Sequence, residues 1–166
     1  NSVTGKLSLL KLPSSYTSLN SILTLIRKEV SDVGFSDNLS RGISGQEIDD
    51  IQCYVNSVPI YDTPVDSLEQ AYRQLADSFP DVCKSLWFDS EFLEEKYLLA
   101  CNLRAAPPSF QAQISSGVQT AALNSEIVIQ VRFKNTPATP LVADSFLISD
   151  VVMQLSANGG ELSVKY

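Results

Sequence analysis

Carboxylates are the first residues of this chain that could do chemistry. Adjacent acidic pairs occur at Asp49-Asp50 and Glu94-Glu95, and two carboxylates flanking a bond are the machinery of glycoside hydrolysis. Neighbouring side chains diverge on a regular helix or strand, so neither pair converges on one substrate bond. Two acids from distant segments could still meet, but nothing singles out such a pair. We interpret these carboxylates as solubilising surface groups.

The 166 residues contain no histidine. This removes the commonest general base, the commonest metal ligand and every Ser-His or Cys-His nucleophile pair. Gly42 and Gly45 lack the Lys-Ser/Thr and the strand-to-helix context of a phosphate-binding loop. The sequence therefore predicts that the chain is not an enzyme and binds no cofactor.

The cysteines are Cys53, Cys83 and Cys101, an odd number without metal-ligand spacing. Cys53 and Cys101 lie among apolar residues, in IQCYV and LLACNL. Free cysteine behaves as a small hydrophobic residue and is among the most buried types. We expect both to be buried free thiols, and we predict no metal site.

Two groups of residues remain as candidates for contacts with other molecules. Trp87, Phe88 and Phe92 form an aromatic cluster, and such rings can stack on a sugar, although packing in a core or subunit interface is their commoner use. Gln119, Thr120 and Asn124 lie in SSGVQTAALN, a small, polar stretch that precedes a strand. We interpret that stretch as a loop free to drape over a neighbouring subunit. All six residues are therefore candidate assembly or receptor contacts.

The bulk composition excludes several classes of protein. The formal net charge is −7 and the 12 basic residues are scattered, which argues against binding to a nucleic-acid backbone. With 44% hydrophobic and 19% charged residues, the chain has the composition of a globular domain. No apolar run approaches the roughly 20 residues that span a bilayer, so we predict no membrane span.

The apolar pattern predicts strands over most of the chain. Ile127, Ile129, Val131 and Phe133 alternate with more polar residues, which is typical of a strand with one buried face. Further strands are expected at 6–12, where the alternation slips at Leu9-Leu10 and indicates a bulge, and at 51–55, 96–105, 145–156 and 161–166. The last two are joined by Ala-Asn-Gly-Gly, a hairpin signal.

Helical spacing is expected in three places. The first helix begins at Thr17 or Ser18, ends at Gly34 and has an apolar face made of Leu19, Ile22, Leu23, Ile26, Val30 and Val33. Ser44 with Glu47 is a capping box for a short turn. Asp66 with Glu69 is a second capping box, before a helix with Leu68, Tyr72, Leu75 and Phe79 on one face that Pro80 ends.

These elements predict a mainly β fold. Strands that are not separated by regular helices argue against a parallel βαβ sheet. We therefore expect six to eight strands in an antiparallel β-sandwich, with two or three helices inserted in its loops.

The segment IDDIQCYVNSVPIYDTPVDSLEQAYRQLADSF, residues 48–79, resembles the second jelly-roll of double jelly-roll viral major capsid proteins. This group includes adenovirus hexon and the capsid proteins of Polinton-like elements and virophages. Val55-Asn56, Pro59, Tyr61 and Ala71-Tyr72 match its strand, aromatic-Pro turn and helix. SGVQTAALNSEIVIQVRF also looks like the loop and strand that precede the last hairpin of that roll.

The resemblance implies a jelly-roll β-sandwich that spans residues 1–166 as a single domain. A double jelly-roll chain is about twice as long, since each roll is a separate eight-stranded sandwich. The chain begins at Asn1 without an initiator Met. We therefore expect it to be a processed product or an excerpt, as the C-terminal roll of a longer chain, or a single-roll vertex or minor capsid protein.

The function that the resemblance implies is structural. Such subunits form trimeric capsomers that tile the icosahedral shell of a virion, assembled inside the host cell. The expected partners are copies of the chain itself, other capsid proteins and a host receptor or glycan, without direct contact to nucleic acid. The alternative is a β-sandwich binding module, such as a viral fibre head or a carbohydrate-binding domain with Trp87 in its platform.

Overall fold

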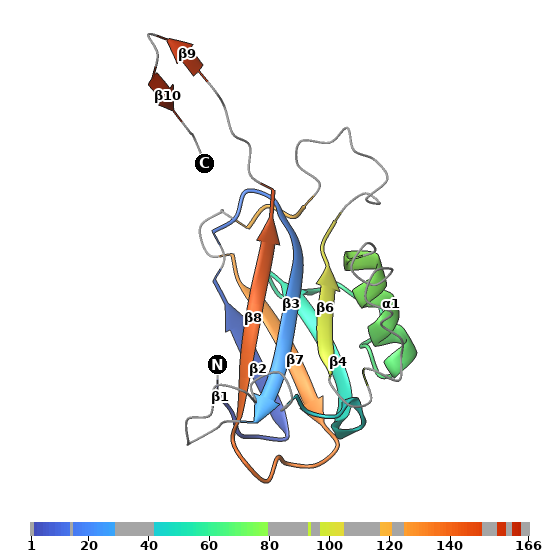
Figure 1. The fold of residues 1–166 in the computed structure, drawn as a ribbon. Helices are drawn as coiled ribbons and strands as arrows, with labels where there is room; N and C mark the ends of the chain where they lie inside the picture. Colours follow the sequence, from blue (N-terminus) through green and yellow to red (C-terminus); the bar gives the residue numbers. More distant parts are fainter. Residues whose placement is uncertain are drawn as a thin grey trace.

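Two four-stranded antiparallel sheets face each other in the computed structural model of the chain (Figure 1). The structure describes residues 2–13, 15–28, 42–79, 93, 97–104, 117–120 and 125–150, and the backbone of 156–158 and 161–163. In spatial order, the first sheet contains β1 (Ser2–Val3), β8 (Leu141–Ser149), β3 (Leu19–Lys28) and β6 (Leu98–Asn102). The second contains β2 (Leu7–Leu12), β7 (Ile127–Phe133), β4 (Ile48–Val55) and β5 (Val58–Pro59).

The other described elements are few. They are a 3₁₀ helix (Gly45–Glu47), the helix α1 (Leu68–Ser78), and a separate hairpin of β9 (Ser156–Asn158) and β10 (Glu161–Ser163). A hairpin is thus present near the C-terminus as expected, but its first arm is the short strand β9 and not the strand expected over 145–156, since residues 145–149 belong to β8 in the first sheet. The expected mainly β class is confirmed as well, as a sandwich-like pair of antiparallel sheets. α1 is one of the two or three expected helices; Leu93 is also helical, but the other residues of 80–96 lie outside the described residues.

The eight strands of the two sheets pair in a regular scheme. β1 pairs with β8, β2 with β7, β3 with β6 and β4 with β5, all antiparallel. These four pairs are those of one long hairpin, in which β1 to β4 form one arm and β5 to β8 form the other. Two further antiparallel pairings, β3 with β8 and β4 with β7, gather the four pairs into two sheets.

The core lies between the sheets, and β7 shows how the sequence builds it. Ile127, Ile129, Val131 and Phe133 are all almost fully buried, whereas the residues between them are partly or fully exposed. Ile22 and Ile26 of β3 belong to the same buried cluster. Full burial of such a side chain contributes about 1.5–3 kcal/mol, so the predicted alternation of β7 is confirmed and is a main source of stability.

The helix expected from Thr17 or Ser18 to Gly34 is wrong, because residues 19–28 form strand β3. Ile22 and Ile26 are four residues apart, a spacing that puts side chains on one face of a helix and also on one face of a strand. β3 lies between β8 and β6 in the first sheet. Its inner face is buried at Ile22, Thr24 and Ile26, and its outer face also carries apolar residues, Leu23 and Leu25. The sequence of β3 therefore lacks the apolar-polar alternation by which a half-exposed strand is recognised. Val30 and Val33 lie outside the described residues.

Strand β2 has no bulge, although the sequence indicated one at Leu9-Leu10. Its six residues pair with β7 without a shift, from Leu7 opposite Arg132 to Leu12 opposite Ile127. Leu10 faces the core and Leu9 faces outward, with 57% of its surface exposed. The inward and outward positions of β2 therefore alternate regularly. The apparent break in the sequence pattern arises because the outward-facing Leu9 is apolar.

The helix starts predicted from the two capping boxes, at Ser44 and at Asp66, are confirmed with small differences. The turn after Ser44 is the 3₁₀ helix, and the Ser44 hydroxyl accepts a hydrogen bond from the Gln46 N–H (3.2 Å). Helix α1 is capped by Ser67 rather than by Asp66, because the Ser67 hydroxyl accepts from the Gln70 N–H (3.3 Å). α1 lies beside β6 (Figure 1). It ends at Ser78, two residues before Pro80 in the sequence.

Candidate functional site

The segment Gly117–Thr120 is the described part of the loop that we expected to be a contact surface. Leu19 and Val118 exchange two backbone hydrogen bonds of 2.9 Å. The Thr120 N–H donates to the Tyr16 carbonyl (2.8 Å), and the Tyr16 N–H donates to the Thr120 hydroxyl (3.1 Å). Gly117–Thr120 is therefore tied to the residues that lead into β3.

Two of the six candidate contact residues, Gln119 and Thr120, lie in the described part of the chain. Gln119 is exposed and available to a partner, whereas Thr120 is fully buried and anchors the segment instead. Trp87, Phe88, Phe92 and Asn124 lie outside the described residues.

A small polar cluster holds this end of the sandwich. The Asp150 carboxylate accepts hydrogen bonds from the Ser18 hydroxyl (2.9 Å) and the Asn20 amide (2.6 Å). The Ser18 hydroxyl also accepts from the Gly117 N–H (3.0 Å). Because Ser18 and Asn20 are buried, these bonds satisfy polar groups that would otherwise be costly to bury. The cluster therefore holds together three segments that are far apart in the sequence, at Ser18–Asn20, Gly117 and Asp150, and its role is structural.

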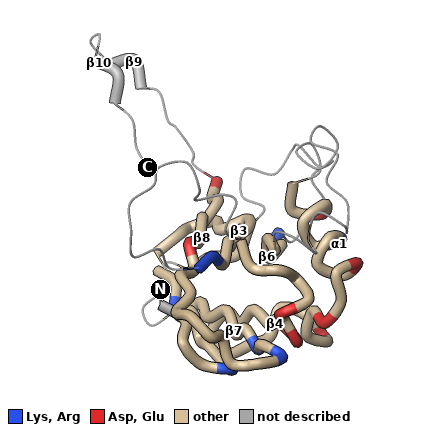
Figure 2. The backbone as a smooth tube through the Cα atoms, turned by 60° about the horizontal axis from the view of Figure 1, so that its bottom comes forward, with Lys and Arg blue, Asp and Glu red and all other residues tan. Residues whose placement is uncertain are grey.

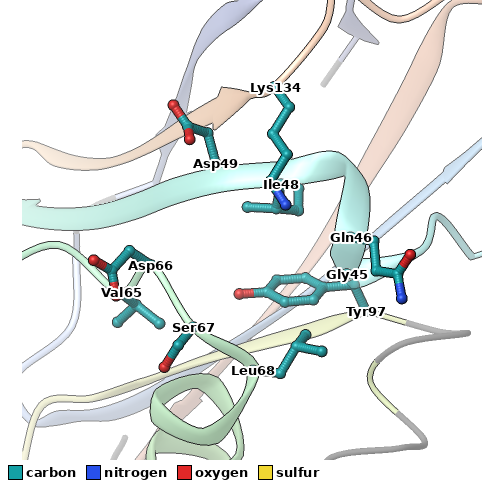
Figure 3. Close-up of a pocket in the computed structure, with 10 residues that line it drawn as sticks. All are labelled: Gly45, Gln46, Ile48, Asp49, Val65, Asp66, Ser67, Leu68, Tyr97 and Lys134. Carbon is teal, nitrogen blue, oxygen red and sulfur yellow. The ribbon is translucent and has the colours of Figure 1, made fainter.

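A pocket of about 100 Å³ lies between the 3₁₀ helix, the start of β4 and the start of α1 (Figure 3). Its polar lining includes Asp49, Asp66 and Lys134, and the ring of Tyr97 extends into it. Small-molecule sites usually measure about 300–1,000 Å³. The pocket is therefore large enough for a few waters but too small for a substrate.

The hydroxyl of Tyr97, in the lining of this pocket, has a raised pKa that can be tested by measurement. Burial and the nearby Cys101 raise the pKa of the Tyr97 hydroxyl above its ordinary value of 10.0. Burial does the same for the pKa of Tyr61, whose hydroxyl donates to the Ala100 carbonyl (3.2 Å). Both phenols are thus held protonated in the native state.

We predict that this protonation lowers stability at high pH. Above about pH 10 the unfolded chain releases the tyrosine protons while the native state keeps them, so unfolding becomes easier as pH rises. Each tyrosine should contribute up to about 1.4 kcal/mol per pH unit. Urea unfolding of Tyr97→Phe and the parent at pH 8 and pH 11 measures this share. The loss between the two pH values should be smaller in Tyr97→Phe; equal losses would contradict the prediction.

The expectation that Cys53 and Cys101 are buried free thiols is confirmed. Cys53 lies on β4 and Cys101 on β6, so the two buried thiols lie near each other between the sheets. The interaction with Cys101, together with burial, raises the pKa of the Cys53 thiol. Since the thiolate is the reactive form, Cys53 is unsuited to nucleophilic catalysis. Cys83 lies outside the described residues.

The outer face of the first sheet carries an apolar surface that the sequence reading did not identify. Phe146 lies opposite Leu23, and Leu25 lies opposite Leu98 on the neighbouring strand. Phe146 and Ile148 are 59% and 36% exposed. We call these five outward-facing residues the outer stripe: Leu23, Leu25, Leu98, Phe146 and Ile148. Contiguous exposed apolar surface is typical of a contact site. The sequence does contain one sign of this surface: Phe146 and Ile148 are two residues apart, so on a strand they lie on the same face, opposite to that of Leu147.

Charged residues are unevenly spread over the described part of the chain. Acidic positions gather around α1 and the segment before it, and basic positions are dispersed (Figure 2). Asp62, Asp66, Glu69 and Asp77 lie there with Arg73 as the basic residue between them. The described surface therefore shows no basic patch of the kind that binds phosphate backbones.

Comparison of the chain with protein-family models, with curated proteins and with solved structures found no significant match. Within the described ranges, no helix is long and apolar enough to cross a membrane. The same ranges contain no group of three side chains placed to hold a metal ion.

Proposed function

We propose that this chain is a structural subunit of a viral capsid, a jelly-roll domain that assembles into trimeric capsomers of an icosahedral shell. A jelly roll is a sandwich of two four-stranded antiparallel sheets, made from eight strands. The observation that carries the proposal is the pairing of β1 with β8, β2 with β7, β3 with β6 and β4 with β5. This is the pairing expected when one long hairpin is wound into such a sandwich.

The residues that carry the resemblance to the capsid family have definite places in the fold. Asn56 lies at the tip of the β4–β5 hairpin with a positive φ of 53°, a conformation that Asn tolerates better than most residues. Its backbone N–H donates to the Glu126 carbonyl (2.8 Å). Ala71 is buried on α1. These positions support the resemblance because each has a structural role in the fold, Asn56 in the hairpin turn and Ala71 in the buried face of α1.

The outer stripe supports assembly as the activity of the domain. A stable interface usually buries about 1,200–2,000 Å² in total, with an apolar centre. Phe146 and Leu23 provide such a centre on a sheet face. Copies of the chain, and other capsid proteins that pack beside them, are the partners that this surface would serve in a virion.

The proposal predicts that the chain associates through the outer stripe. Leu23→Lys places a charge within the stripe and should shift the protein toward the monomer, because an unpaired charge is costly to bury at an interface. The matched control is Gln130→Lys, which faces outward on β7 of the second sheet. Sedimentation velocity over a concentration series measures the effect.

We expect trimers or their multiples for the parent and for Gln130→Lys, and loss of the trimer for Leu23→Lys. Far-UV circular dichroism checks that each variant is folded. A parent protein that stays monomeric up to its solubility limit would contradict the proposed function.

A further inference from the structure

One edge of the first sheet is only partly covered. β1 pairs with Leu141 and Val142 at the beginning of β8, and β8 continues to Ser149. Over Asp144–Ile148, the described chain supplies a strand partner on the β3 side alone. Figure 1 shows β1 beside only the lower end of β8. A stretch of five residues therefore forms a strand edge.

The inward-facing residues of β8 are less buried beyond the point where β1 ends. Leu141 and Ala143 face the core and are 2% and 3% exposed. Further along the same face, Ser145 and Leu147 are only half-buried. On the opposite face, Phe146 is 59% exposed. The sandwich is thus closed beside β1, whereas the described part of the chain leaves it open beside Asp144–Ile148.

A groove of about 500 Å³ lies along this open side. It is lined by Leu12 and Pro13, at the end of β2, and by Phe146 and Leu147 of β8. A strand edge presents backbone N–H and C=O groups at every second residue, and an apolar edge is a template for pairing with another chain. The edge and the groove together have the shape and chemistry that an added strand requires.

We propose that the β8 edge is a twofold interface, in which Asp144–Ile148 pairs antiparallel with the same residues of a second copy. This inference rests on the proposed function, since it names one of the contacts by which the domain would assemble. The first sheet would then run through both copies, as a continuation of the β1–β8–β3–β6 order. The inward-facing Leu147 of each copy would reach the groove of the other.

The neighbouring strand β1 limits the register. β1 occupies the position beside Val142. A register centred on Phe146 keeps the pairing within Asp144–Ile148 and clear of β1, with Phe146 opposite Phe146 of the second copy. Aromatic residues directly opposite each other are favourable cross-strand pairs.

Charge also favours a second copy as the occupant. In this register Asp144 lies opposite Ile148 of the second copy, so the two Asp144 carboxylates do not face each other. Each Asp144 is already paired with the Arg27 Nε within its own copy (2.7 Å). The interface is therefore self-complementary. A twofold contact of this kind differs from the contacts within a trimer, and it would link one capsomer to the next.

Disulfide cross-linking tests the register directly. Phe146→Cys, in a Cys83→Ser background, places two thiols opposite each other, where the Cα atoms of paired residues are about 4.5–5.5 Å apart and a disulfide is readily formed. Ile148→Cys places its thiols four residues apart along the strand, about 13 Å. Val58→Cys, at an exposed apolar position on β5, is the control for random collision.

Under mild oxidation, we expect a disulfide-linked dimer of Phe146→Cys on a non-reducing gel, at least tenfold more than for Ile148→Cys or Val58→Cys. Because Phe146 belongs to the outer stripe as well as to the β8 edge, Phe146→Asp should lose both the twofold-linked species and the trimer in sedimentation velocity, while circular dichroism stays unchanged. Equal cross-linking of all three variants, or none of Phe146→Cys in a parent protein that self-associates, would overturn the β8 interface and leave the capsid proposal standing. A parent that forms only dimers, which Phe146→Asp dissociates, would support the interface and contradict trimeric capsomers.

Discussion

Ile129→Ala should lower the free energy of unfolding by about 2–5 kcal/mol, the usual cost of truncating a large aliphatic side chain in a core. Ile129 is fully buried at the centre of β7 and lies opposite Leu10 on β2 and Cys53 on β4. Removal of its side chain leaves a cavity between the sheets that rigid neighbouring strands cannot close. Urea unfolding followed by circular dichroism measures the loss.

The matched control is Gln130→Ala, the next residue along the same strand. Gln130 faces outward and is half-exposed, so its truncation should cost less than about 1 kcal/mol. The contrast tests which face of β7 is the core face. A loss for Gln130→Ala as large as that for Ile129→Ala would mean that β7 is inserted in another register.

Gly117→Ala should destabilise the chain by about 1–3 kcal/mol through overpacking. An added Cβ would overlap the Leu19 carbonyl oxygen and come within 2.5 Å of the Asn20 Oδ1. The Leu19 carbonyl accepts the Val118 N–H and cannot move without breaking that bond. Native-state hydrogen exchange should show faster exchange of the Val118 amide, in addition to a lower urea midpoint.

Gly5→Ala is the control for the general cost of replacing a glycine. Its added Cβ would meet the Leu7 carbonyl oxygen at 3.2 Å, a contact that a small shift relieves. We expect a change within about 1 kcal/mol. If Gly117→Ala were as mild as Gly5→Ala, then Gly117–Thr120 would not be anchored to the start of β3, and Gln119 would be presented by a free loop.

The sequence predicts the local elements where one signal dominates. β7 has a buried face with period two, and α1 has a serine cap and apolar residues at helical spacing. β3 defeats this reasoning because Ile22 and Ile26 fit a helix and a strand equally, and Thr24, a β-branched residue, is buried beside Ser145, with a hydroxyl distance of 2.8 Å. Its strand identity depends on two neighbouring strands, which local periodicity does not contain.

The candidate contacts depend even more on distant parts of the chain. Thr120 looks like an exposed loop residue until Tyr16, more than a hundred residues away, occupies its hydroxyl. Phe146 looks like a core residue in an apolar run, and its exposure follows from which face of β8 is turned toward the second sheet. Likewise, the meeting of Cys53 and Cys101 requires the two sheets to be stacked. None of these three facts can be derived from residues close in sequence.

The most direct test of the central claim, that this chain is a self-assembling capsid subunit, is single-particle electron microscopy of the concentrated purified protein. We predict particles with threefold symmetry, each built from three sandwiches placed side by side, and larger arrays in which such particles touch at twofold contacts. A uniform population of isolated single sandwiches would contradict the claim.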